Sequence, residues 1–263
     1  MADEATIIRN IRFNRQCLYA GKIGKARELF CLGYIEFKRK MFQEIKTLQS
    51  KCAENHGTNI SCIEGCHYCC SQFIKASFQE CEAIAYYLFN NESKLVDFYS
   101  VVNTWQANIY KHPSILQNLY DTERAVLNRD WNPENVEKLS KTATEYTNLG
   151  IYCPFLHDNL CLIYEVRPWA CASLIATTTA EYCNPHSNNA PNQYAISPLI
   201  IEPDLYDDRL NDVLRTEFMP VTVAGIITRS ILYYKSFAGL EFLTLEQGAD
   251  PEVKKIIETY KRS

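Results

Sequence analysis

Nine consecutive residues hold four of the chain's twelve cysteines, in the run Cys62-Ile-Glu-Gly-Cys66-His-Tyr-Cys69-Cys70. Cysteines spread evenly over 263 residues would put about 0.4 in such a window, so scattered buried cysteines do not explain the run. The Cys66–Cys69 pair has the C-x-x-C spacing that lets one tight turn aim two sulfurs at a single ion, and Cys62 lies one helical turn earlier. Because thiolates suit Zn²⁺, Cu(I) and iron–sulfur clusters, the run predicts a metal site.

Four more cysteines further along the chain add to this run. The neighbours Cys69 and Cys70 point in different directions and seldom fit one tetrahedral ion, which indicates a second site or one idle sulfur. Eight sulfurs are enough for two four-coordinate sites or for one multi-iron cluster with spare ligands. The candidate metal ligands are Cys62, Cys66, Cys69, Cys70, Cys153, Cys161, Cys171 and Cys183. The remaining cysteines fall on helical patterns and are assigned to the core: Cys17, Cys31, Cys52 and Cys81.

The composition is that of a globular protein, and it argues against some classes of binding partner. Hydrophobic residues make up 47% of the chain and charged residues 22%, so it can bury a core without disulfides. A net charge of -4 argues against a nucleic-acid partner. The acidic N-terminus lacks a signal peptide's apolar segment, and the longest apolar stretch, Val221 to Tyr234, is shorter than the roughly 20 residues that span a membrane. We therefore expect a cytoplasmic protein without a membrane partner, whose reduced cysteines bind metal.

Apolar residues recur at helical spacing over much of the chain. Ser77 and Glu80 form a capping box, and Asn132 before Pro133 is typical of an N-cap followed by a first-turn proline. These patterns predict a mainly α fold. The predicted helices are Lys22–Cys52 (one helix, or two broken near Gly33), Phe78–Phe89, Lys94–Tyr110, Ser114–Asn128, Pro133–Gly150, Asp204–Met219, Val221–Phe237 and Pro251–Arg262.

The cysteines lie between these helices. Cys153 to Tyr164 predicts a small β-hairpin about a polar turn at His157 to Asn159, and Thr177 to Gln193 predicts a polar loop. We expect a single helical domain over residues 1–263, in which cysteine-bearing loops form a metal site. Its metal-binding core covers about residues 55–185, with helical extensions at both ends. We also expect the Cys153–Cys171 segment to pack onto the Cys62–Cys70 loop, because each holds too few sulfurs alone.

The cysteine pattern resembles that of a known family. The C-x-x-x-C-x-x-C-C run is followed by Cys153-Pro-Phe-Leu, and then by Cys161 shortly before Ile-Tyr-Glu-x-Arg-Pro-x-x-Cys171. This order and spacing is similar to the YkgJ-like zinc- or iron-chelating cysteine-cluster family, over about 110 residues. The resemblance implies seven of the eight ligands and leaves Cys183 as a candidate beyond the motif. The family commonly has Arg after its last motif cysteine, where this chain has Ala172.

The resemblance also opens alternatives to a plain metal-binding protein. The bacterial flagellin lysine N-methylase shows the same cysteine pattern, which implies methyl transfer from S-adenosylmethionine to a protein lysine, with a catalytic cluster and a protein substrate. A third hypothesis is a metal carrier or redox sensor in which Cys70 or Cys183 is the exchangeable sulfur. The primary prediction is an iron–sulfur centre or zinc held by thiolates, and the spacing alone does not separate iron from zinc.

Neighbouring motifs leave further alternatives open. Cys62, Cys66 and Cys69 match the C-x-x-x-C-x-x-C spacing of radical S-adenosylmethionine enzymes, but the chain lacks the alternating strands and helices of their β/α barrel. Arg167 could offset the negative charge of several thiolates, or pair with Glu165. Any of three histidines could replace a thiolate, although loop histidines are more often solvated: His67, His157 and His186. No P-loop, dinucleotide-binding glycine pattern or H-E-x-x-H motif is present.

Overall fold

Helices dominate the computed structural model, which describes residues 4–127, 132–195, 216–229, 232–233, 242–243 and 251–262. The prediction of a mainly helical fold is confirmed. The α-helices of these residues are α1 (Glu4–Tyr19), α2 (Gly21–Asn55), α3 (Phe78–Phe89), α4 (Glu92–Ile109), α5 (Pro113–Leu127), α6 (Pro133–Asn148), α7 (Trp169–Ala172), α8 (Met219–Arg229) and α10 (Pro251–Arg262). Short 3₁₀ helices are η1 (Tyr68–Ser71), η2 (Tyr164–Val166) and η3 (Ala180–Cys183).

The strands of the described residues form four small antiparallel pairs. They are β1 (Lys75–Ser77) with β6 (Thr216–Phe218), β2 (Leu156–His157) with β3 (Leu160–Cys161), β4 (Leu174–Ala176) with β5 (Gln193–Ala195), and β7 (Leu232–Tyr233) with β8 (Phe242–Leu243). Each pair is only two or three residues long, so the sheets do not form a layer and instead fix the positions of loops between helices.

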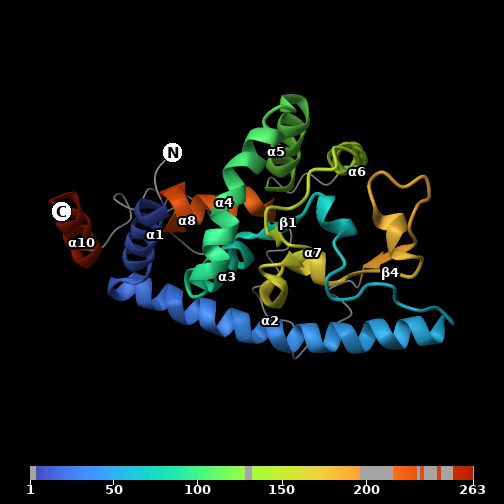
Figure 1. Ribbon diagram of the computed structural model, residues 1–263, viewed down its shortest axis with the longest axis horizontal. Helices are drawn as coiled ribbons and strands as arrows, with labels where there is room; N and C mark the ends of the chain where they lie inside the picture. Colours follow the sequence, from blue (N-terminus) through green and yellow to red (C-terminus); the bar gives the residue numbers. More distant parts are fainter. Residues whose placement is uncertain are drawn as a thin grey trace.

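Helix α2 runs along one side of the molecule, and the other elements lie along it (Figure 1). It is one continuous helix through Gly33, 35 residues long, which corresponds to about 50 Å. Buried residues recur every three or four positions on its second half, among them Tyr34, Lys38 and Met41. Helices α1 and α10 lie near its beginning, whereas β4 lies near its end (Figure 1). The single helix is therefore the frame to which both ends of the structure are attached.

Helix α3 is the centre of the core, and all of its twelve residues are buried. Its start is fixed by the predicted capping box: the Ser77 hydroxyl accepts from the Glu80 amide at 3.1 Å, and the Glu80 carboxylate accepts from the Ser77 amide at 3.1 Å. The core around it includes stacked rings of Phe98 and Phe155, 4.4 Å apart. Because Phe155 follows Cys153 by two residues, this packing also attaches the second cysteine segment to the core.

Two of the predicted helices in the last third of the chain extend into residues that form strands. Residues 196–215 lie outside the described part, and Thr216–Phe218 is a strand that pairs with β1, so the predicted helix to Met219 is wrong at its end. Leu232–Tyr233 is also a strand, so a helix to Phe237 is wrong as well. A strand partner outside the predicted helix decides each case, β1 for the first and β8 for the second, and helical periodicity does not register such partners. Helix α10 is confirmed over the predicted range, whereas α1 has no predicted counterpart.

No helix in the described part of the chain is both long and apolar enough to cross a membrane.

Candidate metal centre

A buried ion pair holds the segment that carries Cys171. The fully buried Lys38 ammonium of α2 donates to the Glu80 carboxylate at 3.2 Å and to the Val166 carbonyl at 3.1 Å. The same Glu80 oxygen accepts from the Trp169 amide at 2.8 Å, at the first residue of α7. Glu80 therefore closes the cap of α3 and also ties α2 to α7. Since Cys171 follows Trp169 by two residues, this network sets the position of its backbone.

The two cysteine segments meet through the backbone. The Cys153 amide donates to the Cys70 carbonyl at 2.8 Å, although 83 residues separate them in the sequence. This contact confirms the prediction that the Cys153–Cys171 segment packs onto the Cys62–Cys70 loop. Two separate stretches of the chain thus bring their sulfurs to one region.

The predicted hairpin is present and returns the chain towards Cys153. Its two turn residues, Asp158 and Asn159, have φ of +48° and +62°, as a two-residue type I′ turn requires. The register pairs Leu156 with Cys161. Asp and Asn tolerate this left-handed conformation better than other non-glycine residues, so the local sequence fixes the turn. The hairpin therefore carries Cys161 back beside the loop from which it started.

The last candidate ligand, Cys183, meets Cys62 at the β4–β5 pair. The Ala176 amide donates to the Cys62 sulfur at 3.2 Å, and the Gln193 side-chain amide donates to the Cys183 sulfur at 3.5 Å. Ala176 and Gln193 are partners in the strand register, so they lie directly opposite each other. The Ser61 amide also donates to the Ala176 carbonyl at 2.9 Å. The first and last of the eight candidate cysteines are therefore attached to the same pair of strand residues.

The thiols also interact electrostatically and so change one another's pKa values. The Cys70 thiol shares a hydrogen bond with the Cys69 sulfur, which lowers the pKa of Cys69 to about 7 and raises that of Cys70. Burial raises the pKa of Cys153 to about 12 and raises that of Cys171 well above its ordinary value. The charge of Cys69 acts on five more of the candidate thiols, Cys62, Cys153, Cys161, Cys171 and Cys183. Cys69 therefore lies at the middle of the group.

Arg167 is the cation that acts on the largest number of these thiols. Its guanidinium lies 4.1 Å from the centre of the Tyr164 ring, and its Nε is buried without a hydrogen-bond partner among the described residues. The Glu165 carboxylate accepts instead from Arg39, at 3.2 Å. The positive charge of Arg167 acts to lower the pKa of four thiols: Cys62, Cys69, Cys161 and Cys171. Of the two roles considered for Arg167, the geometry favours the one that offsets thiolate charge.

The three histidines have other neighbours. The His157 ring nitrogen lies 3.8 Å from both the Asp97 and the Asp158 carboxylates. The His186 ring fills the space beside Gly150, where a Cβ would come within 2.8 Å of its Nε2. His67 lies against aromatic rings, those of Tyr68 and Tyr152. These contacts give each histidine a local role in packing or on the surface.

The thiols lie close together without surrounding a common point. Within the described residues, no group of three or more Cys, His, Asp or Glu side chains is arranged so that it could hold a metal ion. Seven of the eight candidate cysteines are half-buried, and Cys62 is exposed. All eight are free thiols, so no disulfide prevents their side chains from turning. The donor set is chemically suited to a soft metal, and rotation of the side chains has to complete the coordination.

The four cysteines assigned to the core divide into two cases. Cys17, Cys31 and Cys81 are buried, as predicted. Cys52 is exposed on α2, so its assignment to the core is wrong. The buried residues at this end of α2 are Ile45, Gln49 and Ala53, so the packed face passes beside Cys52 and leaves it in solvent.

Two features of the site were missing from the sequence-based prediction. Lys38 lies on the apolar face of α2, between Tyr34 and Met41 at helical spacing, and a lysine at such a position is a readable signal of a buried pair. Gln193, the donor to Cys183, has no comparable signal, because its role depends on a strand pairing across 17 residues.

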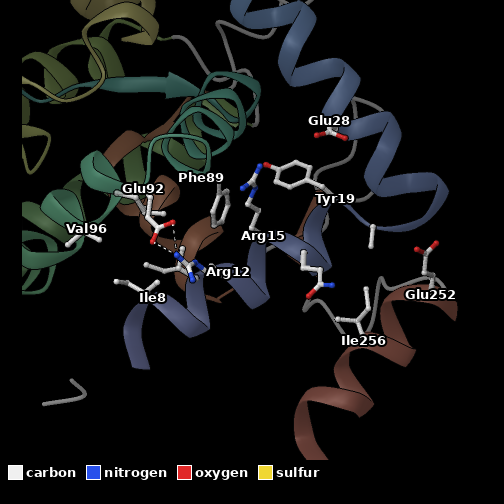
Figure 2. A pocket seen from close by; sticks show the side chains of 14 residues that line it. Ile8, Arg12, Arg15, Tyr19, Glu28, Phe89, Glu92, Val96, Glu252 and Ile256 are labelled. Carbon is white, nitrogen blue, oxygen red and sulfur yellow. Dashed lines mark hydrogen bonds and ion pairs between the residues drawn. The ribbon is translucent and has the colours of Figure 1, made fainter. Parts of the chain in front are cut away.

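A separate pocket of about 540 Å³ lies at the other end of α2, between α1, α4 and α10 (Figure 2). Its cations already have partners: Arg12 pairs with Glu92 at 2.7 Å, and Arg15 donates to the Asn90 side chain at 2.6 Å. An adenosine pocket for the methyl-transfer hypothesis has to adjoin the thiols, and this pocket is lined by other elements. It therefore adds nothing to that hypothesis.

No protein-family model, curated protein or solved structure matches the chain.

Proposed function

We propose that this protein binds a metal centre, zinc or an iron–sulfur cluster, through cysteine thiolates. The observation that supports this most is the bond between Cys153 and Cys70, together with the attachment of Cys62 and Cys183 to facing residues of one strand pair, because these contacts bring cysteines from distant parts of the chain together. These cysteines lie in short turns, strands and helical turns between the long helices, and Cys153, Cys161 and Cys171 also pack against the hydrophobic core. Such a donor set is what soft metal ions prefer.

The residues around the thiols suit this function. Backbone and side-chain N–H groups point at the sulfurs of Cys62 and Cys183, and such hydrogen bonds stabilise thiolate ligands. Arg167 supplies positive charge beside a group that becomes strongly negative when it binds a metal. Zinc in such a centre would cross-link the loops, and an iron–sulfur cluster would add one-electron chemistry.

Metal binding is common to all three functional hypotheses. Methyl transfer to a protein lysine with S-adenosylmethionine rests on the family resemblance, and a carrier or redox-sensor role rests on the number of sulfurs. The geometry of the described residues favours neither of these additions. A thiolate metal centre is therefore the function that the arrangement of side chains supports best.

The test is metal analysis of the full chain purified without oxygen, together with its absorption spectrum. We expect stoichiometric zinc, or iron with the brown colour of an iron–sulfur protein. Cys66→Ser should remove most of the metal, because each ligand is needed and its bond energy also stabilises the fold. The matched control is Cys52→Ser, which replaces an exposed cysteine of α2 and should leave the metal content unchanged. Full metal content in the Cys66 variant would show that the assignment is wrong.

A further inference from the structure

We propose that the eight thiols form two neighbouring four-thiolate sites, each for one divalent metal ion, and that Cys69 and Cys70 supply one sulfur to each. This inference rests on the proposed metal-binding function. The inner site consists of Cys70, Cys153, Cys161 and Cys171. The outer site consists of Cys62, Cys66, Cys69 and Cys183.

The outer site is organised by the β4–β5 pair. Cys62 and Cys183 accept hydrogen bonds from Ala176 and Gln193, which face each other across the two strands. The Ala176 amide and carbonyl both face the Ser61–Cys62 segment, so this segment lies along the outer edge of β4, and Cys183 lies at the Gln193 side chain of β5. The Gln72 side-chain amide donates to the Gln193 side-chain oxygen Oε1 at 3.2 Å, which attaches the loop of Cys69 to the same strand pair.

The remaining outer ligand, Cys66, is brought in by a local turn. Its amide donates to the Ile63 carbonyl at 3.1 Å, and Gly65 takes a φ of +87°, so the chain reverses direction between Cys62 and Cys66. Burial raises the pKa of Cys183, and the charges of the other three outer-site thiols raise it further. Cys183, which lies outside the cysteine motif of the family, is thus the fourth thiol of the outer site.

The inner site is organised by the hairpin and α7. Burial raises the pKa of the Cys153 and Cys161 thiols, and the N–H groups of Phe155 and Ile163, each two residues further along the chain, act in the opposite direction. Cys171 lies in the first turn of α7, which the Lys38–Glu80 pair holds in place.

The number of thiols and the charges around them argue against a single metal ion that is bound by only four of these thiolates. A closed zinc site uses four sulfurs, which would leave four thiols of this group idle. Two sites use all eight, and Arg167 acts on thiols of both, on Cys62 as well as on Cys171. Lys94 acts on Cys161 of the inner site as well. Because the Cys69 and Cys70 sulfurs share a hydrogen bond, two ions bound to them lie next to each other.

The test is a titration of the full, reduced and metal-free protein with Co²⁺, followed by sulfur-to-cobalt charge-transfer absorption. We expect wild type to bind two equivalents. Cys183→Ser should lose the Co²⁺ ion of the outer site, and Cys171→Ser should lose that of the inner site. Each variant should therefore bind one equivalent. Should Cys171→Ser not fold, Cys161→Ser replaces another ligand of the inner site, at a half-buried position of the hairpin, and should have the same effect. Cys52→Ser is the matched control and should retain two equivalents.

Electron paramagnetic resonance gives an independent measurement on the same samples. Two neighbouring Co²⁺ ions should show magnetic coupling in wild type, and the one-equivalent variants should show none. A single equivalent in wild type that either ligand variant abolishes would overturn the two-site arrangement and leave the proposed function intact. Two retained equivalents in Cys183→Ser would also overturn it. Failure of wild type to bind Co²⁺, Zn²⁺ or iron at all would overturn the proposed function as well.

Discussion

The core and the loops of this protein use the same residue in two ways. Cys17, Cys31 and Cys81 lie on helices with apolar neighbours, and burial raises the pKa of Cys17 to about 11. The candidate ligands lie beside N–H donors, a guanidinium and one another, and three of them, Cys153, Cys161 and Cys171, also pack against the edge of this core. The residue type is identical, and the surroundings decide whether a sulfur acts as a small apolar group or as a metal ligand.

The two regions are joined by the buried Lys38–Glu80 pair, and breaking it should have the largest effect. Lys38→Ala leaves the Glu80 carboxylate buried without its cation, which should lower the free energy of unfolding by about 3–5 kcal/mol. Urea denaturation measures this loss. Because Glu80 also holds the start of α7, the variant should bind metal more weakly through Cys171.

The matched control lies two residues further along the same helix. Lys40 pairs with Glu36 on the exposed face of α2, so Lys40→Ala should change stability by only about 0.5 kcal/mol or less. Equal effects of the two lysine variants would show that the Lys38 pair does not hold the structure.

A substitution within the core tests the other side of the comparison. Cys31→Ser places a hydroxyl at a fully buried position and should cost roughly 1 kcal/mol, without changing the metal content. Thermal unfolding and metal analysis of the same preparation measure both quantities. Loss of metal in a variant that remains folded would show that the core cysteines belong to the metal centre.

The smallest effect should appear in thiol reactivity of the native protein, which needs no substitution. The thiolate is the reactive form, and the raised pKa of Cys17 keeps that thiol neutral at every pH below about 10. Alkylation at pH 8 should therefore modify the exposed Cys52 quickly and Cys17 only on unfolding. Peptide mass spectrometry gives both rates. Fast modification of native Cys17 would contradict its place in the core.

Local signals predicted much of the fold. The Ser77–Glu80 capping box, helix α10 and the turn at Asp158 and Asn159 all depend on residues close together in sequence. Strand β6 did not follow from the sequence, because its residues have β1 as their partner more than a hundred positions away. Cys52 shows a related limit, since the helical pattern does not show that the packed face at this end of α2 runs through Gln49 and Ala53 instead.

The candidate site divides in the same way. The sequence by itself determined which residues could bind metal, because sulfur chemistry and C-x-x-C spacing are local properties. Only the tertiary structure joined Cys153 to Cys70, and Cys183 to Cys62 through Gln193. It also showed that Lys38 of α2 holds the helix that carries Cys171. These pairings depend on backbone and side-chain partners that are far apart along the chain, and the residue pattern of either partner alone does not specify the other.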